Sequence, residues 1–162
     1  MIRSLLVLAV ATCAVPTQAG QISGQAKAID STSIQIGDQR IMLFGIDSVM
    51  RKQICTLDGK PWQCWQAAVK DLQAVLDQGP VVCDAVRESD VYGRILARCK
   101  VNDQSVNELL VSRGFAVARP NESTDYTAAE AAAKEKKLGL WQRQFSPPSV
   151  FRRSAGVAVD RP

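Results

Sequence analysis

Two cysteines in the middle of the chain are placed to face each other across a turn. The β-rich runs "PVVCDAV" (80–86) and "GRILARCKV" (93–101) flank the turn sequence "RESDVYG". If this turn centres near Val91, Cys83 and Cys99 are each eight residues from its centre. Residues opposed in antiparallel strands lie about 4.5–5.5 Å apart at Cα, which is within reach of a disulfide. The spacing therefore predicts a hairpin in which these two cysteines can be bonded.

The start of the chain has the layout of a secretory signal peptide. Arg3 gives a positive start, an apolar stretch from residue 4 to residue 15 follows, and "TQA" ends at Ala19. This layout predicts a signal peptide over residues 1–19 and a periplasmic or secreted mature protein. The apolar stretch is too short for a transmembrane helix. Lipidation at Cys13 is the alternative, although Thr12 is an unusual residue before a lipidated cysteine.

The mature chain then has four cysteines and no histidine. An even number of cysteines in an exported protein predicts two disulfides among Cys55, Cys64, Cys83 and Cys99. Zinc is a poorer use of them, because none of the spacings is the short C-x2-C of zinc sites. The lack of histidine excludes His-based acid–base catalysis and Ser–His or Cys–His nucleophiles.

The charge of the mature chain is mild. Removing Arg3 leaves 19 basic and 16 acidic side chains, a net charge of +3 (19 − 16). Such a charge permits contact with a polyanion but does not by itself indicate one.

Hydrophobic periodicity predicts three strands before the first helix and two after it. The early strands are expected over residues 21–29, 33–37 and 39–46. The helix is expected over residues 61–79, where apolar residues recur at spacings of three and four. The two tryptophans of this stripe, Trp62 and Trp65, are interpreted as core residues.

Two further helices are expected after the second hairpin. "SVNE" (105–108) is a capping box that begins one of them, with Ser105 as the cap. The other runs through "YTAAEAAAKEKK" (126–137), which is rich in strong helix formers. The folded domain is expected to span residues 20–152, followed by a disordered tail over residues 153–162.

Five short strands with a helix between the third and the fourth are the layout of an OB-fold. The sequence therefore predicts an α+β fold, a five-stranded OB barrel with three helices. Such barrels often bind oligonucleotides or oligosaccharides, but fold alone does not decide function.

Several short motifs resemble those of the staphylococcal nuclease (thermonuclease-like) family, in the family's order. They are "AIDSTSI", "RIMLFGID", "QIC", "WQC", "DVYGRILARC", "LLVSRGFAVA", "LGLW" and "FSPPSVFR". The resemblance covers about Ala28 to Arg152. The cysteine pattern is similar to that of exported bacterial members, and this similarity implies the pairs Cys55–Cys64 and Cys83–Cys99.

Active members of this family hydrolyse phosphodiester bonds in DNA and RNA with calcium. The resemblance implies two metal-binding carboxylates, two phosphate-clamping arginines and a glutamate that activates water. Asp47 matches one metal carboxylate and Arg94 matches the second arginine. The other three positions differ, because the second carboxylate, the first arginine and the glutamate are replaced by Thr32, Met42 and Met50.

This degenerate site predicts an exported module without nuclease activity and without a cofactor. The resemblance implies binding or accessory work, with a link to exopolysaccharide production such as succinoglycan synthesis. A nucleic acid, a polysaccharide or an envelope protein would be its partner. The alternative is a weak calcium-dependent nuclease in which Asp47 still holds Ca²⁺ and Arg94 still contacts phosphate.

Overall fold

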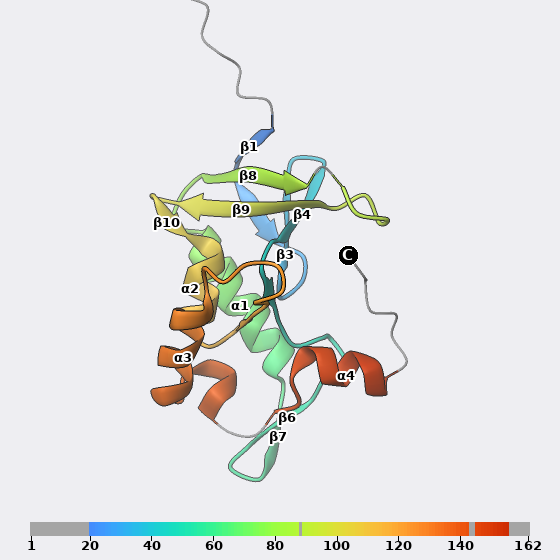
Figure 1. Cartoon of the computed structure of the whole chain (residues 1–162), viewed down its shortest axis with the longest axis vertical. Helices are drawn as coiled ribbons and strands as arrows, with labels where there is room; N and C mark the ends of the chain where they lie inside the picture. The colour runs from blue at the N-terminus through green and yellow to red at the C-terminus, as the bar shows by residue number, and fades with distance from the viewer. Residues whose placement is uncertain (1–19, 88, 143–144, 156–162) are drawn as a thin grey trace, which may run out of the picture.

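A computed structural model describes residues 20–87, 89–142 and 145–155 of the chain (Figure 1). The predicted signal peptide, including Cys13, and residues 156–162 of the predicted tail lie outside the described residues. The strands are β1 (Gln21–Gly24), β2 (Ala26–Ala28), β3 (Ser33–Ile36), β4 (Gln39–Leu43), β5 (Ile46–Asp47), β6 (Cys55–Leu57), β7 (Lys60–Trp62), β8 (Val81–Arg87), β9 (Ile95–Val101), β10 (Gln104–Ser105) and β11 (Val117–Ala118).

The main sheet is mixed, in the order β1-β8-β9-β4-β3-β2, with β10 added to β9. Its first and last strands in this order are neighbours in the chain, because only Gln25 separates β1 from β2. The expected strand over residues 21–29 is therefore one segment bent after Gly24, whose halves pair with β8 and β3 at opposite edges. This mixed sheet with its helices confirms the predicted α+β, OB-like class of fold.

Among the described residues there are four α-helices, one more than predicted. They are α1 (Cys64–Leu76), α2 (Val106–Ser112), α3 (Thr127–Glu135) and α4 (Pro148–Ser154), with a short 3₁₀ helix, η1 (Gly139–Gln142). In Figure 1, α2 and α3 lie at the left of the view and α4 at the right, with α1 and β4 between them. Because α4 extends to Ser154, the first two residues of the predicted tail, 153 and 154, are helical.

The helix predicted over residues 61–79 begins three residues later, at Cys64. Residues 60–62 instead form β7, which pairs with β6 in a hairpin. Asp58 and Gly59 make its two-residue turn with φ of +52° and +75°, and Asp-Gly is a favoured sequence for such turns. The helix is present, and Leu72 and Leu76 of the predicted stripe are buried in it, but a local hairpin replaces its predicted first turn.

Both expected disulfides are present. Cys55, at the start of β6, bonds to Cys64, the first residue of α1, with their Cα atoms 5.7 Å apart. Cys83 and Cys99 are directly opposite in the β8–β9 pairing and are bonded with their Cα atoms 4.0 Å apart. The first bond fixes the β6–β7 hairpin to α1, and the second joins the two longest strands.

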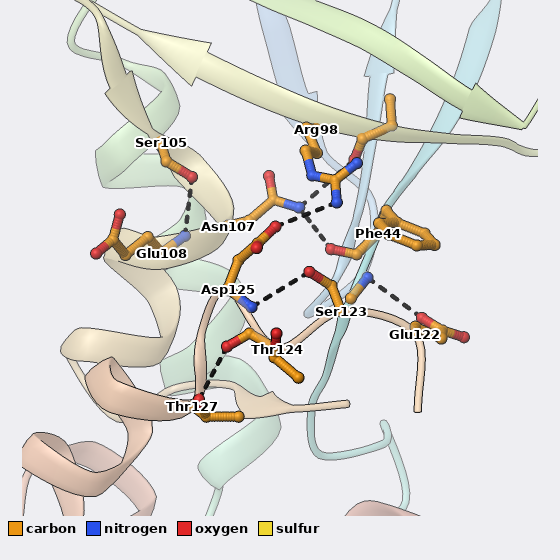
Figure 2. Close-up of polar contacts among 12 residues, drawn as sticks. Phe44, Arg98, Ser105, Asn107, Glu108, Glu122, Ser123, Thr124, Asp125 and Thr127 are labelled. Carbon is orange, nitrogen blue, oxygen red and sulfur yellow. Dashed lines mark hydrogen bonds and ion pairs between the residues drawn. The ribbon is translucent and has the colours of Figure 1, made fainter. Parts of the chain in front are cut away.

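The buried side chain of Asn107 ties α2 to the sheet. Its Oδ1 accepts a hydrogen bond from the backbone N–H of Cys99 at 3.1 Å. Its Nδ2 donates to the carbonyl oxygen of Phe44 at 2.9 Å, as Figure 2 shows. One fully buried amide thus connects α2, β9 and the end of β4.

We expect Asn107→Leu to destabilise the fold, because it keeps the side-chain volume but removes both hydrogen bonds. The N–H of Cys99 and the carbonyl of Phe44 would be buried without this partner, a loss on the order of 3 kcal/mol in the free energy of unfolding. Chemical denaturation measures it. Gln104→Leu, which replaces an exposed amide, should change stability by less than about 0.5 kcal/mol. Equal effects of the two variants would contradict the role given to Asn107.

Candidate functional site

A cavity of about 300 Å³ gathers all five positions that the sequence marked as the family's site. It is lined by Thr32, Met42, Asp47, Met50 and Arg94 among others. These residues come from the segments around β3, β4, β5 and the start of β9. The parallel pairing of β4 with β9, in which Met42 lies opposite Leu96, brings two distant parts of the chain to this place.

Asp47 is held at the cavity by a sharp turn and a short pairing. Gly45, between β4 and β5, has φ of +76°, and a Cβ there would meet the ring of Tyr126 at 2.9 Å. The turn leads into β5, where Asp47 pairs with Val117 of β11. The backbone N–H of Ser48 then donates to Asp47 Oδ1 at 2.9 Å. Glycine is needed at this turn, and its geometry fixes the carboxylate that follows.

The carboxylate of Asp47 forms a bidentate ion pair with Arg152 of α4. Arg152 Nη1 donates to Oδ1 at 2.9 Å, and Nη2 donates to Oδ2. Both side chains are largely buried, with Arg152 19% and Asp47 9% exposed. Parallel N–H···O bonds of this kind are the strong form of an ion pair. The aspartate that resembles a metal ligand therefore faces a cation supplied by the same chain.

Helix α4 reaches the cavity because the segment before it is anchored. Gln53 donates from Nε2 to the carbonyl oxygen of Ser146 at 2.6 Å. Its Oε1 accepts from the backbone N–H of Met50 at 3.3 Å. One buried glutamine thus ties the approach to α4 to the loop that carries Met50.

Arg94 is held from one side by Asp90. Its Nε donates to Asp90 Oδ2 at 2.7 Å, and its guanidinium carbon lies 5.0 Å from the centre of the Tyr92 ring. Burial alone would raise the pKa of Asp90. The hydrogen bonds from the side chain of Arg94 and from the N–H groups of Arg94 and Tyr92 outweigh it, and the pKa lies below its usual value.

The residues present do not fit calcium. Calcium takes six to eight oxygen ligands, and its affinity depends on how many of them are charged. Thr32 offers a hydroxyl, Met50 offers no oxygen in its side chain, and both oxygens of Asp47 bind Arg152. The other carboxylate of the lining, Asp30, accepts hydrogen bonds at Oδ1 from Trp65 Nε1 and from the backbone N–H of Ser31. Within the part of the chain that the structure describes, no three His, Cys, Asp or Glu residues gather as a metal site.

The structure adds site residues that the sequence did not single out. Arg51, Arg119 and Arg152 line the cavity together with Asp30. Asp30 accepts a hydrogen bond from Trp65 Nε1 at 2.7 Å, so this tryptophan, placed in the core by the sequence analysis, also supports the cavity rim. Two of the quoted motifs contain such residues, since Asp30 lies in "AIDSTSI" and Arg152 ends "FSPPSVFR".

Comparison with known proteins identifies the family of this chain. The model of the family described as "Staphylococcal nuclease homologue" matches residues 40–143, more than half of the chain. The chain belongs to the staphylococcal nuclease family. The resemblance found in the sequence motifs is thereby confirmed.

One curated relative matches beyond the boundaries of the family model. It is the succinoglycan biosynthesis protein ExoI of Rhizobium meliloti (strain 1021), 31% identical over 127 residues. The match covers 76% of this chain and 66% of the relative, so it spans a little less than two thirds of that protein.

The lowered pKa of Asp90 leads to a test of the Arg94 contact. A group whose pKa is lower in the folded state adds stability above its unfolded pKa, about 3.9 for aspartate, and this stability is lost as the pH falls through the folded pKa. We expect Arg94→Gln to raise the pKa of Asp90 and to make stability less sensitive to pH below about 4. An NMR titration of the Asp90 carboxyl carbon measures the shift, with Arg113→Gln as the control. An unchanged Asp90 pKa in Arg94→Gln would rule out this account.

Proposed function

We propose that this chain is a non-catalytic staphylococcal nuclease homologue that acts as a binding or accessory module in exopolysaccharide production. The ion pair between Asp47 and Arg152 is the main support for the absence of catalysis. An active site of this kind needs a carboxylate that holds a metal, and here the two oxygens of Asp47 are bound by a guanidinium.

The chemistry of the other positions supports the same proposal. Methionine at 42 and 50 supplies neither the charge that stabilises a phosphoryl transition state nor a base that activates water. Losing one preorganised charge-stabilising group costs on the order of 10²–10³ in rate. Here an arginine, a base and a metal carboxylate are replaced together.

The link to exopolysaccharide rests on the relative whose name describes succinoglycan biosynthesis. The match covers 66% of that relative's length, and we extend its role in exopolysaccharide production to this chain as part of the proposal. Binding modules on OB-like folds often accept oligosaccharides, so the fold is compatible with such a role.

A location outside the cytoplasm completes the proposal. Two disulfides join the described cysteines, and disulfides persist in oxidising compartments such as the periplasm and the cell exterior. No helix in the described residues is long and apolar enough to cross a membrane. We therefore place the working protein in the periplasm or outside the cell.

A weak calcium-dependent nuclease is the second candidate. It is favoured by one observation, which is that Asp47 and Arg94 line the same cavity. For this function, Arg152 would have to leave Asp47 so that a cation could bind. Robust catalysis would therefore require a rearrangement of α4.

We expect the purified protein to show no calcium-dependent cleavage of single-stranded DNA or RNA above a mock preparation. The measurement is product formation with calcium and with a chelator, beside Arg94→Ala as a matched control. Calcium-dependent activity that disappears in Arg94→Ala would establish the nuclease. A variant carrying Thr32→Asp, Met42→Arg and Met50→Glu tests whether restoring the missing groups is sufficient for calcium-dependent cleavage.

We expect disruption of the gene in the organism that encodes this chain to lower the yield of secreted polysaccharide. Supplying the wild-type gene in trans should restore the yield, and supplying the Cys83→Ala/Cys99→Ala variant should restore less of it, because losing a disulfide across a loop of this size costs about 3 kcal/mol of stability. Polysaccharide is measured as total secreted sugar per cell. A yield that does not change on disruption would contradict the exopolysaccharide link.

A further inference from the structure

Four arginines from four separate segments line the cavity. Arg51 follows β5, Arg94 precedes β9, Arg119 follows β11, and Arg152 lies in α4. Among the described residues of the lining, two are acidic, Asp30 and Asp47. An excess of guanidinium groups around a small cavity indicates a site for an anion, because each presents planar N–H donors suited to carboxylate or phosphate.

Two of these arginines are held by acids that do not line the cavity. Asp90 binds Arg94, and Glu122 binds Arg119 at 2.8 Å. With these two acids, four arginines face four carboxylates among the described residues, so the directed N–H donors, and not a large net charge, are the basis of recognition. A guanidinium has five N–H donors, so the pairing of Arg119 with Glu122 orients its side chain while it can still donate to a ligand.

Arg152 has a different role from the other three arginines, because it neutralises the carboxylate of Asp47. A bare Asp47 carboxylate at the cavity would repel an anion, and in the family that charge is met by a metal ion. Here the guanidinium of Arg152 meets it through two hydrogen bonds. Arginine stays protonated at every physiological pH, so this neutralisation needs neither calcium nor a change of conditions.

The remaining lining suits a sugar residue. Thr32 and Ser33 contribute hydroxyl groups, while Met42 and Met50 contribute apolar surface. Sugars present hydroxyls on their edges and C–H groups on their faces. A volume of about 300 Å³ lies at the small end of ligand sites and fits one sugar residue of a longer chain.

We propose that this arginine-lined cavity binds the carboxylate of an acidic sugar residue without a metal, and that Arg152 makes this possible by neutralising Asp47. The inference rests on the proposed function and names the ligand class of the same cavity. Arg119 and Arg51 supply donors to the ligand, while Arg152 is a positioning residue that acts through Asp47.

The binding test compares two ligands that differ only in charge. A short glucuronic acid oligosaccharide is titrated into ¹⁵N-labelled protein at constant ionic strength, with a chelator present to remove calcium. A second titration uses the same oligosaccharide with its carboxylates methyl-esterified. We expect the acid form to shift the backbone amide signals of Ser48 and Arg94 saturably. The ester should bind on the order of tenfold more weakly or worse, because it cannot accept charge-assisted hydrogen bonds. Added calcium should not tighten the binding of the acid form.

Variants separate direct contact from neutralisation. Arg119→Gln should weaken binding on the order of tenfold, and Arg40→Gln, an exposed arginine of β4 outside the cavity lining, should not. Arg152→Gln removes the cation that neutralises Asp47 and should weaken binding at least as much. Asp47→Asn combined with Arg152→Gln removes both charges and should recover most of the affinity. This double variant keeps the test valid if Arg152→Gln alone does not fold, since it buries no unpaired charge.

Four results would overturn the proposal. They are a requirement for calcium, equal binding of acid and ester, no saturable binding of the acid form, and a double variant that binds no better than Arg152→Gln. A thymidine trinucleotide that binds more tightly than the acidic oligosaccharide would instead assign the cavity to nucleic acid. Failure of these titrations together with absent nuclease activity would remove this site but leave the accessory role in place, so the two proposals fail separately.

Discussion

The buried amide of Asn107 holds together the parts of the sheet on which the cavity depends. It binds the N–H of Cys99 in β9 and the carbonyl of Phe44 just after β4. Because β4 and β9 run parallel, no short turn can join them, and their register must be maintained by tertiary contacts. That register places Met42 beside Leu96 and brings the start of β9, with Arg94, to the same end of the sheet. The cavity is therefore a product of strand pairing supported by one helix.

The ion pair of Asp47 and Arg152 shows how a fold of this family can retain the aspartate at a metal-binding position and pair it with an arginine in place of a metal ion. A largely buried carboxylate is costly unless it is paired and hydrogen-bonded. Calcium is one way to pair it, and an arginine from the same chain is another. Thr32, Met42 and Met50 add no carboxylate to the cavity, so a calcium ion would meet only Asp30 and Asp47 as charged ligands among the described residues of the lining. The pairing of Asp47 with Arg152 needs no further charged oxygen.

The sequence predicted those features that have local causes. The facing cysteines of β8 and β9 followed from their equal distance to a turn, and the start of α2 followed from its cap, where the N–H of Glu108 donates to Ser105 Oγ at 3.2 Å. The β6–β7 hairpin was missed although its Asp-Gly turn was readable, because the helical stripe overlapped it. Arg152 as partner of Asp47 could not be read from the sequence, since 105 residues separate the two. Only the packing of α4 reveals that contact.

The distance along the chain between these two residues also bears on how the cavity is assembled. Asp47 is in place once β5 and β11 have paired, whereas Arg152 lies in the last helix that the structure describes. Residues far apart in the sequence can make contact only when the long segment between them is closed into a loop, which costs conformational entropy. In the folded domain, the guanidinium on α4 supplies the two hydrogen bonds that neutralise Asp47. The electrostatic character of the cavity therefore depends on a helix that contributes nothing to the sheet.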